Sequence, residues 1–389
     1  MTDSPIARPL PFALAFATAA LLAACGGGGG GGTPSQPTTG GGQNCTTGPY
    51  GTTCVPTGNG FGGAGGGNYV ANALVSDSTA TQALHHDANL INAWGLAFNP
   101  QGFSWVANAG TGTSTLYDGD GVAQSLVVTL PAGTDASGIV FNGTSDFSIT
   151  ENGVSGAAPF IFATLQGQIA AWAPTVDATH AFTIVDNATS GAVYTGLAID
   201  TAGDMIYAAD FTKASVDVFS GSFAPVTTAG GFVDSTLPAG YAPFGIQQIG
   251  DKIYVAYAQP DPTTHEKVGA GLGLVDVFDT QGNLVSHLIP AGGALNAPWG
   301  LAMAPPNFGK FSNMLLVGNF GDGKINVYDP ATGAMAGTVS NNDGSAIVVP
   351  GLWALQFGNG INAQPTNTLF YTAGPGNEQH GLYGRIDMN

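Results

Sequence analysis

A short phrase built around glycine recurs along the chain and restricts its fold more than any other feature. It consists of an aromatic or small residue, then Gly-Leu or Gly-Ile, then in most copies two apolar residues. The copies lie roughly 45–60 residues apart, a spacing typical of repeat architectures. Five copies carry the glycine and a sixth has alanine: WGLAF at 94–98, SGIVF at 137–141, TGLAI at 195–199, FGIQQ at 244–248, WGLAM at 299–303 and WALQF at 353–357.

Each copy is followed by further strand-like segments. After a short apolar run come runs that end in an aromatic residue, such as VDVFD at 275–279, and then a last apolar run, such as 284–289. β-branched and aromatic residues between Gly, Pro, Asn and Asp turns are typical of strands. No stretch after residue 70 keeps a helical period. Four antiparallel strands per unit, repeated six times, predict an all-β fold, a six-bladed β-propeller over residues 68–389.

The two ends of the repeat region complement each other. The sixth unit ends after its third strand, at 381–386, and we predict that residues 69–75 supply its outer strand and so remove an exposed sheet edge. The second unit is ambiguous, because 147–150 and 159–164 both fit its second strand. It therefore needs an extra hairpin or a widened loop at 151–158. An open solenoid or a pair of β-sandwiches is the alternative architecture.

The first 24 residues have the features of a lipoprotein signal peptide. The apolar run 10–24 is too short to span a membrane and matches the apolar region of a secretory signal. It ends in Leu-Ala-Ala before Cys25, which resembles the lipobox of bacterial lipoproteins. This resemblance implies lipidation of Cys25 and anchoring to a bacterial membrane, with the outer membrane or cell surface as the expected location. An ordinary signal peptide that happens to end in cysteine is the alternative.

Residues 25–67 are predicted to be a flexible tether. Seven consecutive glycines at 26–32 have a large backbone entropy to lose and nothing to bury. The tether also contains Cys45 and Cys54. Export permits a disulfide, and no third cysteine remains once Cys25 is lipidated, so we predict a Cys45–Cys54 bridge. Two unpaired thiols are the alternative.

The charge balance is acidic. The chain has 7 Lys and Arg against 25 Asp and Glu, which gives a formal net charge of −18. Nucleic-acid binding depends on basic patches that neutralise phosphate, so we expect no nucleic-acid partner. Docking on anionic lipid by charge is disfavoured for the same reason.

Several longer phrases resemble an uncharacterised family of bacterial exported β-propellers, some members of which carry a C-terminal PEP-CTERM sorting tail. The phrases lie at 73–77, 237–244, 296–301, 317–323 and 366–375, and the resemblance covers residues 69–386. No such tail precedes Asn389, so the lipobox is expected to take over that sorting role. More broadly, the units resemble NHL-type and gluconolactonase-type six-bladed propellers. The resemblance implies fold and export, and no agreed activity.

A site is expected at the mouth of the central channel. The loops from strand four to the next strand one, and from strand two to three, share this face. Asn108, Asp210 and Asn319 end the second strands of blades one, three and five, so their oxygens can converge on the axis and suit Ca²⁺. Gluconolactonase-like enzymes use a similar set with a glutamate, for which Glu151 is the candidate. The alternative is that the three side chains cap their own turns.

Two further groups at this face are ambiguous. Trp94, Phe244, Trp299 and Trp353 begin four innermost strands, where they serve either as a ligand platform, with Trp94 and Trp299 as ligand contacts, or as core. The run His-His-Asp at 85–87 is either a metal cluster or a polar loop. The sequence has no Gly-x-Ser-x-Gly elbow, phosphate loop or dinucleotide fingerprint.

Two functions follow from this sequence. The first is a non-enzymatic, lipid-anchored binding or scaffold module with a protein, glycan or small-molecule ligand at the propeller face. The second is a Ca²⁺-dependent, lactonase-like hydrolase or lyase with its site at the channel mouth. No catalytic residue is assigned, and Ca²⁺ is the one cofactor predicted.

Overall fold

The computed structural model describes residues 43–48, 51–56, 69–262 and 265–389, and the chain divides into two units, 1–58 and 59–389. The described part of the first unit is an antiparallel hairpin of β1 (Gln43–Gly48) and β2 (Gly51–Pro56). Its register places Cys45 opposite Cys54, and the disulfide between them stays a prediction. The predicted signal peptide, Cys25 and the glycine run lie outside the described residues.

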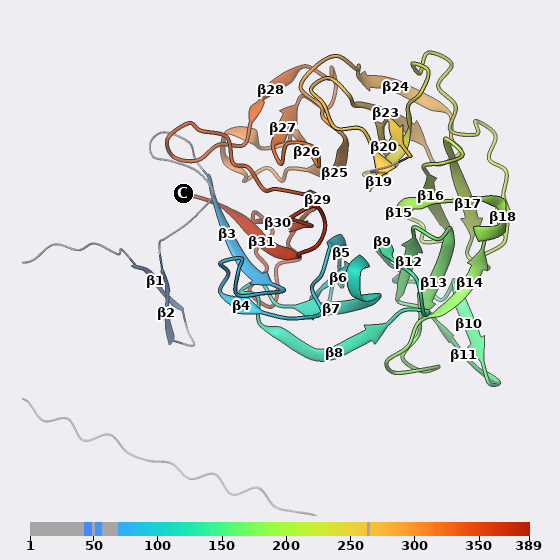
Figure 1. The fold of residues 1–389 in the computed structure, drawn as a ribbon, viewed down its shortest axis with the longest axis horizontal. Coiled ribbons are helices and arrows are strands. Elements are labelled where there is room, and N and C mark those ends of the chain that lie inside the picture. Colours follow the sequence, from blue (N-terminus) through green and yellow to red (C-terminus); the bar gives the residue numbers. More distant parts are fainter. Residues whose placement is uncertain (1–42, 49–50, 57–68, 263–264) are drawn as a thin grey trace, which may run out of the picture. The chain divides into compact units, whose positions relative to one another are not determined.

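The second unit is a ring of six antiparallel sheets around a central axis, as predicted (Figure 1). The first strand of each sheet lies nearest the axis. Blades one to three contain β5 (Ala93–Phe98), β6 (Ser104–Asn108), β7 (Thr113–Tyr117) and β8 (Ala123–Thr129); β9 (Ala136–Phe141), β12 (Phe160–Thr164), β13 (Gln168–Trp172) and β14 (Phe182–Asp186); and β15 (Tyr194–Ile199), β16 (Met205–Asp210), β17 (Ser215–Ser220) and β18 (Pro225–Val226).

Blades four to six follow the same order, and the last takes its fourth strand from the start of the domain. They contain β19 (Ala242–Ile249), β20 (Lys252–Ala258), β23 (Leu274–Asp279) and β24 (Leu284–Ile289); β25 (Pro298–Met303), β26 (Leu315–Asn319), β27 (Ile325–Tyr328) and β28 (Met335–Thr338); and β29 (Leu352–Phe357), β30 (Leu369–Ala373), β31 (Leu382–Met388) and β3 (Tyr69–Ser76). The described residues contain no α-helix. Their short elements outside the blades are the hairpins β10 (Ser148–Glu151) with β11 (Val154–Ala157) and β21 (Pro260–Asp261) with β22 (His265–Glu266), and the 3-10 turns η1 (Ala109–Thr111), η2 (Ala188–Ser190) and η3 (Gly309–Phe311). The short β4 (His85–His86) adds a fifth strand to blade six, parallel to β3.

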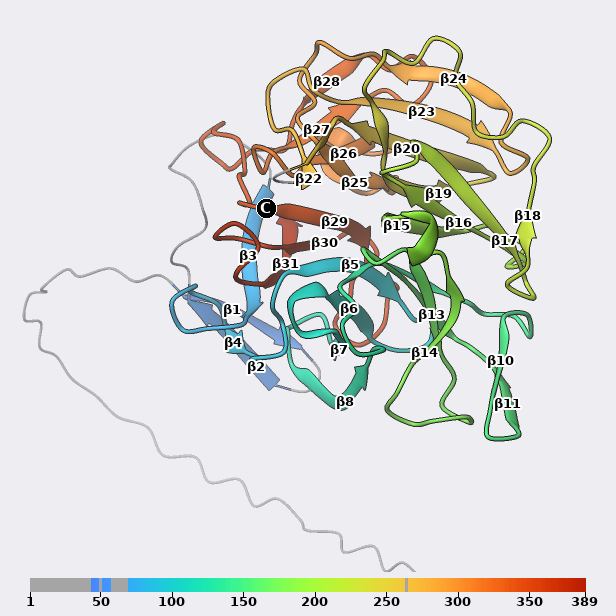
Figure 2. The ribbon, with the colours of Figure 1, turned by 45° about the vertical axis from the view of Figure 1, so that its right-hand side comes forward.

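The predicted closing strand is confirmed. β3 lies antiparallel beside β31, with Tyr69 opposite Met388 and Ser76 opposite Leu382 (Figure 2). The Tyr69 ring is fully buried and its hydroxyl donates a hydrogen bond to the Phe308 carbonyl of blade five at 2.8 Å. The start of the domain is therefore fixed to two blades, and blade six has no open edge at β31.

Blade two contains the extra hairpin that the sequence required. Its second strand is β12, whereas the other candidate segment forms β10, which pairs with β11 as a separate two-stranded sheet. The hairpin is inserted between the first and second strands of the blade and projects from the rim of the ring in both views (Figures 1 and 2).

The repeated glycine lies where neighbouring first strands approach most closely. A β-carbon on the glycine would lie 2.7 Å from an atom of the next blade at Gly95, 2.5 Å at Gly138, 2.1 Å at Gly245 and 2.5 Å at Gly300. Each of these atoms belongs to the backbone, which cannot move aside as a side chain can. Gly196 is less tight, with its nearest such atoms at 3.3 Å. The phrase keeps its glycine in five copies because neighbouring first strands approach too closely there for a side chain, whereas the sixth copy has Ala354.

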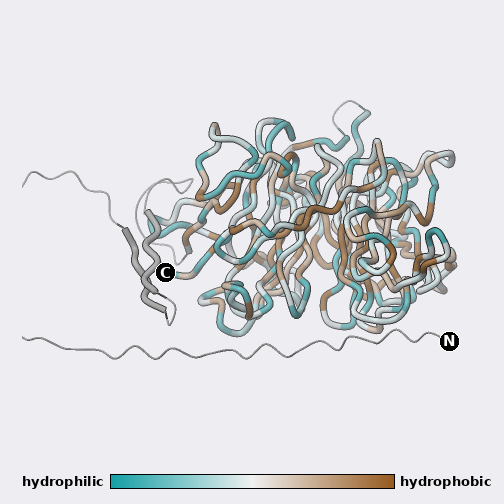
Figure 3. Tube along the Cα trace, turned by 90° about the horizontal axis from the view of Figure 1, so that it is seen from below, coloured by the Kyte–Doolittle hydropathy of each residue, from teal (hydrophilic) through white to brown (hydrophobic). Residues whose placement is uncertain are grey.

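Each pair of adjacent blades shares one hydrophobic cluster, so the core is divided among the six blade interfaces. Strands alternate between the two neighbours: in β23, Leu274 and Phe278 pack toward blade three, while Val275 and Val277 pack toward blade five. Figure 3 shows apolar residues concentrated within the ring and hydrophilic residues in the outer loops. A chain of this length can therefore be stable without one oversized core.

The glycine contacts can be tested by substitution. We expect Gly245→Ala to lower the free energy of unfolding by about 1–3 kcal/mol, because the new methyl group meets the Trp299 carbonyl and forces strands apart. Gly293→Ala is the matched control, since a β-carbon there meets nothing within 4 Å. Equilibrium unfolding in urea measures both variants. Equal stability of the two would contradict the close-approach explanation.

Candidate functional site

The central channel is too narrow for a ligand. A cavity of about 20 Å³ lies on the axis, and its lining residues come from the first strand of every blade, among them Leu96, Ile139, Leu197, Ile246 and Leu355. This volume accommodates about one water molecule. A ligand that uses the propeller axis must therefore sit at the mouth of the channel.

The mouth is closed by what we call the axial cluster, to which all six blades contribute. Its centre is a stack of three rings: Trp353 lies between Trp94, at a centroid distance of 3.9 Å, and Phe320, at 4.1 Å. Phe244 and Trp299 contact the same Trp353 ring at 5.9 and 6.0 Å. The remaining members are Ala109, Leu165, Phe211, Ala242, Ala258 and Ala297.

The rings differ in accessibility. Trp94 and Trp353 are buried, with exposed fractions of 1% and 0%, so both serve as core. Phe320 and Trp299 are partly exposed. The Trp299 indole also donates a hydrogen bond to the Thr195 carbonyl of blade three at 2.8 Å. The outer surface of the cluster is therefore formed by its partly exposed members, Leu165, Trp299 and Phe320.

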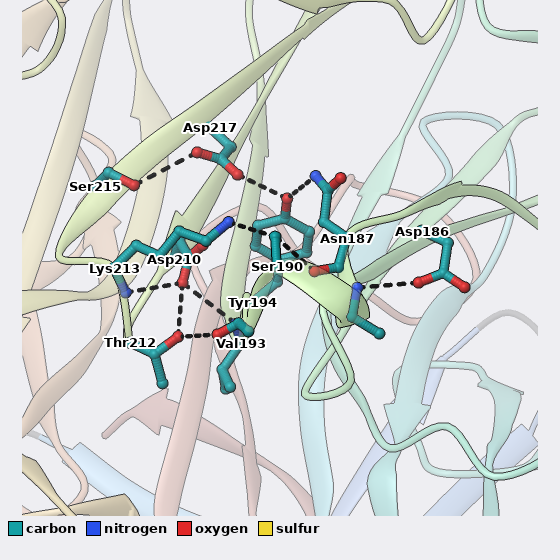
Figure 4. Close-up of polar contacts among 12 residues, drawn as sticks. Asp186, Asn187, Ser190, Val193, Tyr194, Asp210, Thr212, Lys213, Ser215 and Asp217 are labelled. Carbon is teal, nitrogen blue, oxygen red and sulfur yellow. Dashed lines mark hydrogen bonds and ion pairs between the residues drawn. The ribbon is translucent and has the colours of Figure 1, made fainter.

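Asp210 joins two loops of the mouth (Figure 4). Its fully buried carboxylate accepts hydrogen bonds from the backbone N–H of Val193 at 3.2 Å, the N–H of Lys213 at 3.1 Å and the hydroxyl of Thr212 at 3.1 Å. Val193 belongs to the connection from blade two, whereas the other two donors belong to the turn after β16. The Lys213 ammonium lies 3.4 Å from the second carboxylate oxygen. This carboxylate thus fixes the loops that flank the axis.

A second polar chain continues outward from the same blade (Figure 4). Asn187 donates to the Tyr194 hydroxyl, and that hydroxyl donates to the Asp217 carboxylate, both at 2.7 Å. Burial, together with the nearby carboxylates, raises the pKa of Tyr194 well above its usual range. The phenol therefore stays protonated and acts as a hydrogen-bond donor.

Asn108 and Asn319 have equivalent positions and also bond within their own blade region. Asn319 accepts from the Asn296 N–H and donates to the Ala294 carbonyl and to Asp322, at 3.0–3.1 Å. Asn108 donates to the hydroxyls of Thr113 and Thr115, at 3.1 and 3.0 Å. Among the described residues, no hydrogen bond joins any two of Asn108, Asp210 and Asn319. Asp210 and Asn319 thus anchor loops, Asn108 bonds to strand β7, and calcium binding by the three stays a prediction.

The side chains that reach the axis belong to the next residue in each case. Ala109, Phe211 and Phe320 follow the three polar residues and lie in or against the axial cluster. Their backbone N–H groups make equivalent hydrogen bonds, to the carbonyls of Asn92, Val193 and Ala297. Successive side chains of a strand point in opposite directions. The polar side chain at each strand end points away from the axis, so the side chain of the next residue points toward it.

One carboxylate, Glu378, borders the axial cluster, and a second, Glu266, lies near Glu378. Glu378 accepts a hydrogen bond from the Asn92 amide at 2.8 Å, and the same amide accepts one from the Trp353 indole at 3.1 Å. Glu266, in β22, is 3% exposed. Burial raises the pKa of Glu266 to about 8, and the negative charges of Glu378 and Asp261 add to this effect. The mouth thus combines aromatic rings with carboxylates.

Other predicted site residues do not converge at the mouth. Glu151 ends β10, in a connection between first and second strands, which places it on the face opposite the mouth loops. His85 and His86 form the exposed β4. His86 contacts the Ser76 hydroxyl at 2.9 Å, while Asp87 accepts from the Tyr117 hydroxyl at 2.9 Å. The residues 85–87 therefore have separate partners and behave as a polar loop.

The structure contains one cluster that sequence reasoning missed. Asp234, Asp276 and His287 place their ligand-type atoms within 4.8 Å of one another. Burial raises the pKa of Asp276 to about 6, and the adjacent His287 opposes this shift. A sequence signal existed for one member, because Asp276 interrupts the apolar strand LVDVF, a position at which a charged residue needs a partner. Asp234 had no such signal.

The fold and these clusters define the class: the chain is a β-propeller with a closed channel and an aromatic mouth. No protein-family model matches it. It belongs to a family with two proteins of Acanthamoeba polyphaga mimivirus. Uncharacterized protein R648 is 32% identical over 325 residues, covering 81% of this chain and 79% of that protein. Uncharacterized protein L690 is 32% identical over 297 residues, covering 73% and 77%.

Two solved structures are similar to the chain at low identity. Streptogramin B lyase matches with a TM-score of 0.47 and 11% identity, covering 83% of this chain and 98% of that one. A nidogen/laminin complex matches with a TM-score of 0.42 and 15% identity, covering 68% and 82%. Within the described residues, no helix has the length and apolar character needed to cross a membrane.

Replacing Asp210 distinguishes a role in holding the mouth loops from a role in binding calcium. We expect Asp210→Ala to lower the free energy of unfolding by about 2–4 kcal/mol, because the Val193 and Lys213 N–H groups lose their acceptor. Asp210→Asn keeps one oxygen acceptor and should cost less. Urea unfolding with and without millimolar calcium measures both. A loss independent of calcium assigns Asp210 to the loops alone, whereas stabilisation by calcium in the wild type only would support an axial metal.

Proposed function

We propose that this protein is an exported, lipid-anchored binding module whose ligand contacts the mouth of the propeller. The observation that carries the proposal is the axial cluster, since it closes the mouth and leaves two partly exposed rings, Trp299 and Phe320, while Glu378 is joined to the Trp353 indole through Asn92. Rigid blades hold this surface, while the loops around it are free to differ among relatives.

The chemistry of the mouth favours an organic cation. The face of an aromatic ring attracts ammonium and guanidinium groups, by about 0.5–2 kcal/mol according to desolvation. Glu378 places a carboxylate beside the Trp353 indole through Asn92, and the chain as a whole is acidic. A quaternary ammonium group, or a basic side chain of a protein partner, matches both features.

Proton release should accompany binding of a cation. The raised pKa of Glu266, about 8, keeps this carboxyl largely protonated at neutral pH. A cation nearby favours the ionised form and lowers that pKa, so affinity should rise as pH increases through about 8. The stability of the fold has the opposite pH dependence from the affinity. The folded-state pKa of Glu266 lies above its unfolded value, so the contribution of this residue to stability falls as pH rises between about 4.5 and 8.

Choline provides a direct test, because 3,3-dimethylbutan-1-ol has the same shape without the charge. Tryptophan fluorescence should report binding of choline and not of the alcohol. We expect Phe320→Ala and Glu378→Gln to weaken choline binding roughly 3- to 30-fold. Asp251→Asn is the control, since that carboxylate is 86% exposed at the end of the blade away from the mouth. Equal affinity for choline and the alcohol, or no effect of either mouth variant, would contradict the proposal.

The anchoring part of the proposal rests on the lipobox-like Leu-Ala-Ala before Cys25. We expect Cys25→Ala to release the protein from membranes or block its maturation, since that thiol is the site of lipidation. Membrane fractionation with and without globomycin, which blocks lipoprotein signal cleavage, measures this. A wild-type protein that fractionates as soluble and is unaffected by the drug would refute the anchor.

A further inference from the structure

Blade four contains a buried group of two aspartates and one histidine, side-chain types that can bind metals. Asp276 lies in β23 and His287 directly opposite it in β24. Asp234 comes from the loop at 227–241 that connects blade three to blade four. The backbone fixes this loop to blade four, since Gly230 and Phe232 donate to the carbonyls of Gln281 and Gly282 at 2.8 and 3.0 Å. The three side chains are thus brought together by two independent elements.

Both carboxylates are removed from water. The side chain of Asp276 is 0% exposed and that of Asp234 1%, whereas that of His287 is 29% exposed. Asp276 lies on the face of β23 that also carries Leu274 and Phe278, within the apolar interface with blade three. A buried carboxylate needs compensation by charge or hydrogen bonds.

The histidine alone does not supply that compensation. Its Nδ1 lies 2.6 Å from Oδ1 of Asp276 and 3.0 Å from Oδ2 of Asp234. One N–H carries a single proton and serves one of these oxygens well. Oδ2 of Asp276 is buried with no hydrogen bond of ordinary geometry, although the Tyr257 hydroxyl interacts with that carboxylate. Oδ2 of Asp234 is also buried and has the histidine contact at 3.0 Å. The other oxygen of Asp234 is occupied by the N–H and hydroxyl of Thr236, both at 2.7 Å, which orient the carboxylate.

We infer that Asp234, Asp276 and His287 form a binding site for a divalent transition-metal ion of the zinc type. Two carboxylate oxygens and one imidazole nitrogen are a ligand set that suits Zn²⁺ better than Ca²⁺ or Mg²⁺, which favour oxygen alone. Two negative charges balance the ion. The partly exposed histidine leaves a path from solvent and room for a water as fourth ligand.

The geometry needs only a small adjustment to take the ion. Bonds of about 2.0–2.2 Å in a tetrahedral site keep ligand atoms roughly 3.4 Å apart. The present separations, from 2.6 Å to within 4.8 Å, bracket that value. The ion would then join the inter-blade loop at 227–241 to the outer strands of blade four. Binding should stabilise the folded state, because the unfolded chain cannot present the three ligands together.

Zinc titration of the full chain tests the site. After treatment with EDTA and removal of any affinity tag, calorimetry should show one zinc equivalent that is lost, or weakened at least about tenfold, in Asp234→Asn and in His287→Gln. Excess zinc should raise the melting temperature of the wild type by about a few degrees and leave those variants unchanged. His180→Gln is the matched control, since His180 also pairs with an aspartate, Asp177 at 3.1 Å, but on the surface.

Two outcomes would overturn the inference. One is zinc binding with the same stoichiometry and affinity in the wild type and in both ligand variants. That result would show that Asp234 and His287 do not bind the zinc. The other comes from zinc-edge X-ray absorption of the wild type, which does not depend on the variants folding. We expect one imidazole with only nitrogen and oxygen neighbours. Sulfur neighbours, or two or more imidazoles, would assign the zinc to cysteines or to His85 and His86 instead.

Discussion

The contact between the glycine of one first strand and the backbone of the next determines how tightly the ring can close. At Gly245 a single methyl group would lie 2.1 Å from the Trp299 carbonyl oxygen. Because such contacts recur between adjacent blades, the six sheets come close enough for their hydrophobic clusters to meet and for the channel to shrink to about 20 Å³. Ser137 and Thr195, which precede two of these glycines, donate to carbonyls of the next blade at 2.6 and 2.8 Å, so the same positions also supply directional bonds.

The narrow channel in turn decides where function can lie. With the axis filled by the Phe320–Trp353–Trp94 stack, the inner surface of the propeller is core, and chemistry is left to its loops and outer strands. The mouth carboxylates lie on connections, whereas the blade-four cluster combines one connection, which carries Asp234, with the outer strands that carry Asp276 and His287. Such connections can vary without disturbing the glycine contacts, which explains how one ring tolerates different surfaces.

The ring was predictable from the sequence and the sites were not. Each blade repeats short segments with the same types of residue, so the six blades and the closing strand at 69–75 can be predicted from local sequence patterns. Asn108, Asp210 and Asn319 stood out because polar residues at strand ends are visible in a sequence, yet Asn108 bonds to the neighbouring strand, and Asp210 and Asn319 bond to nearby loops. The axial position belongs to the following residue, which looks like ordinary core. Asp234 lies near Asp276 only because of the path that the loop at 227–241 takes. No spacing of residues in the sequence predicts that path.

The strand that completes blade six has a consequence for the order of assembly. It joins residues that are far apart in the chain, such as Asn72 and Asp387, which are 315 positions apart and share a hydrogen bond at 3.0 Å. Every earlier blade pairs strands that are near neighbours in sequence and can form as they are synthesised. The last pairing has a large loop entropy to overcome and a high contact order. Until it forms, β31 presents an unpaired edge, so a slowly closing chain is exposed to association with other copies through that edge.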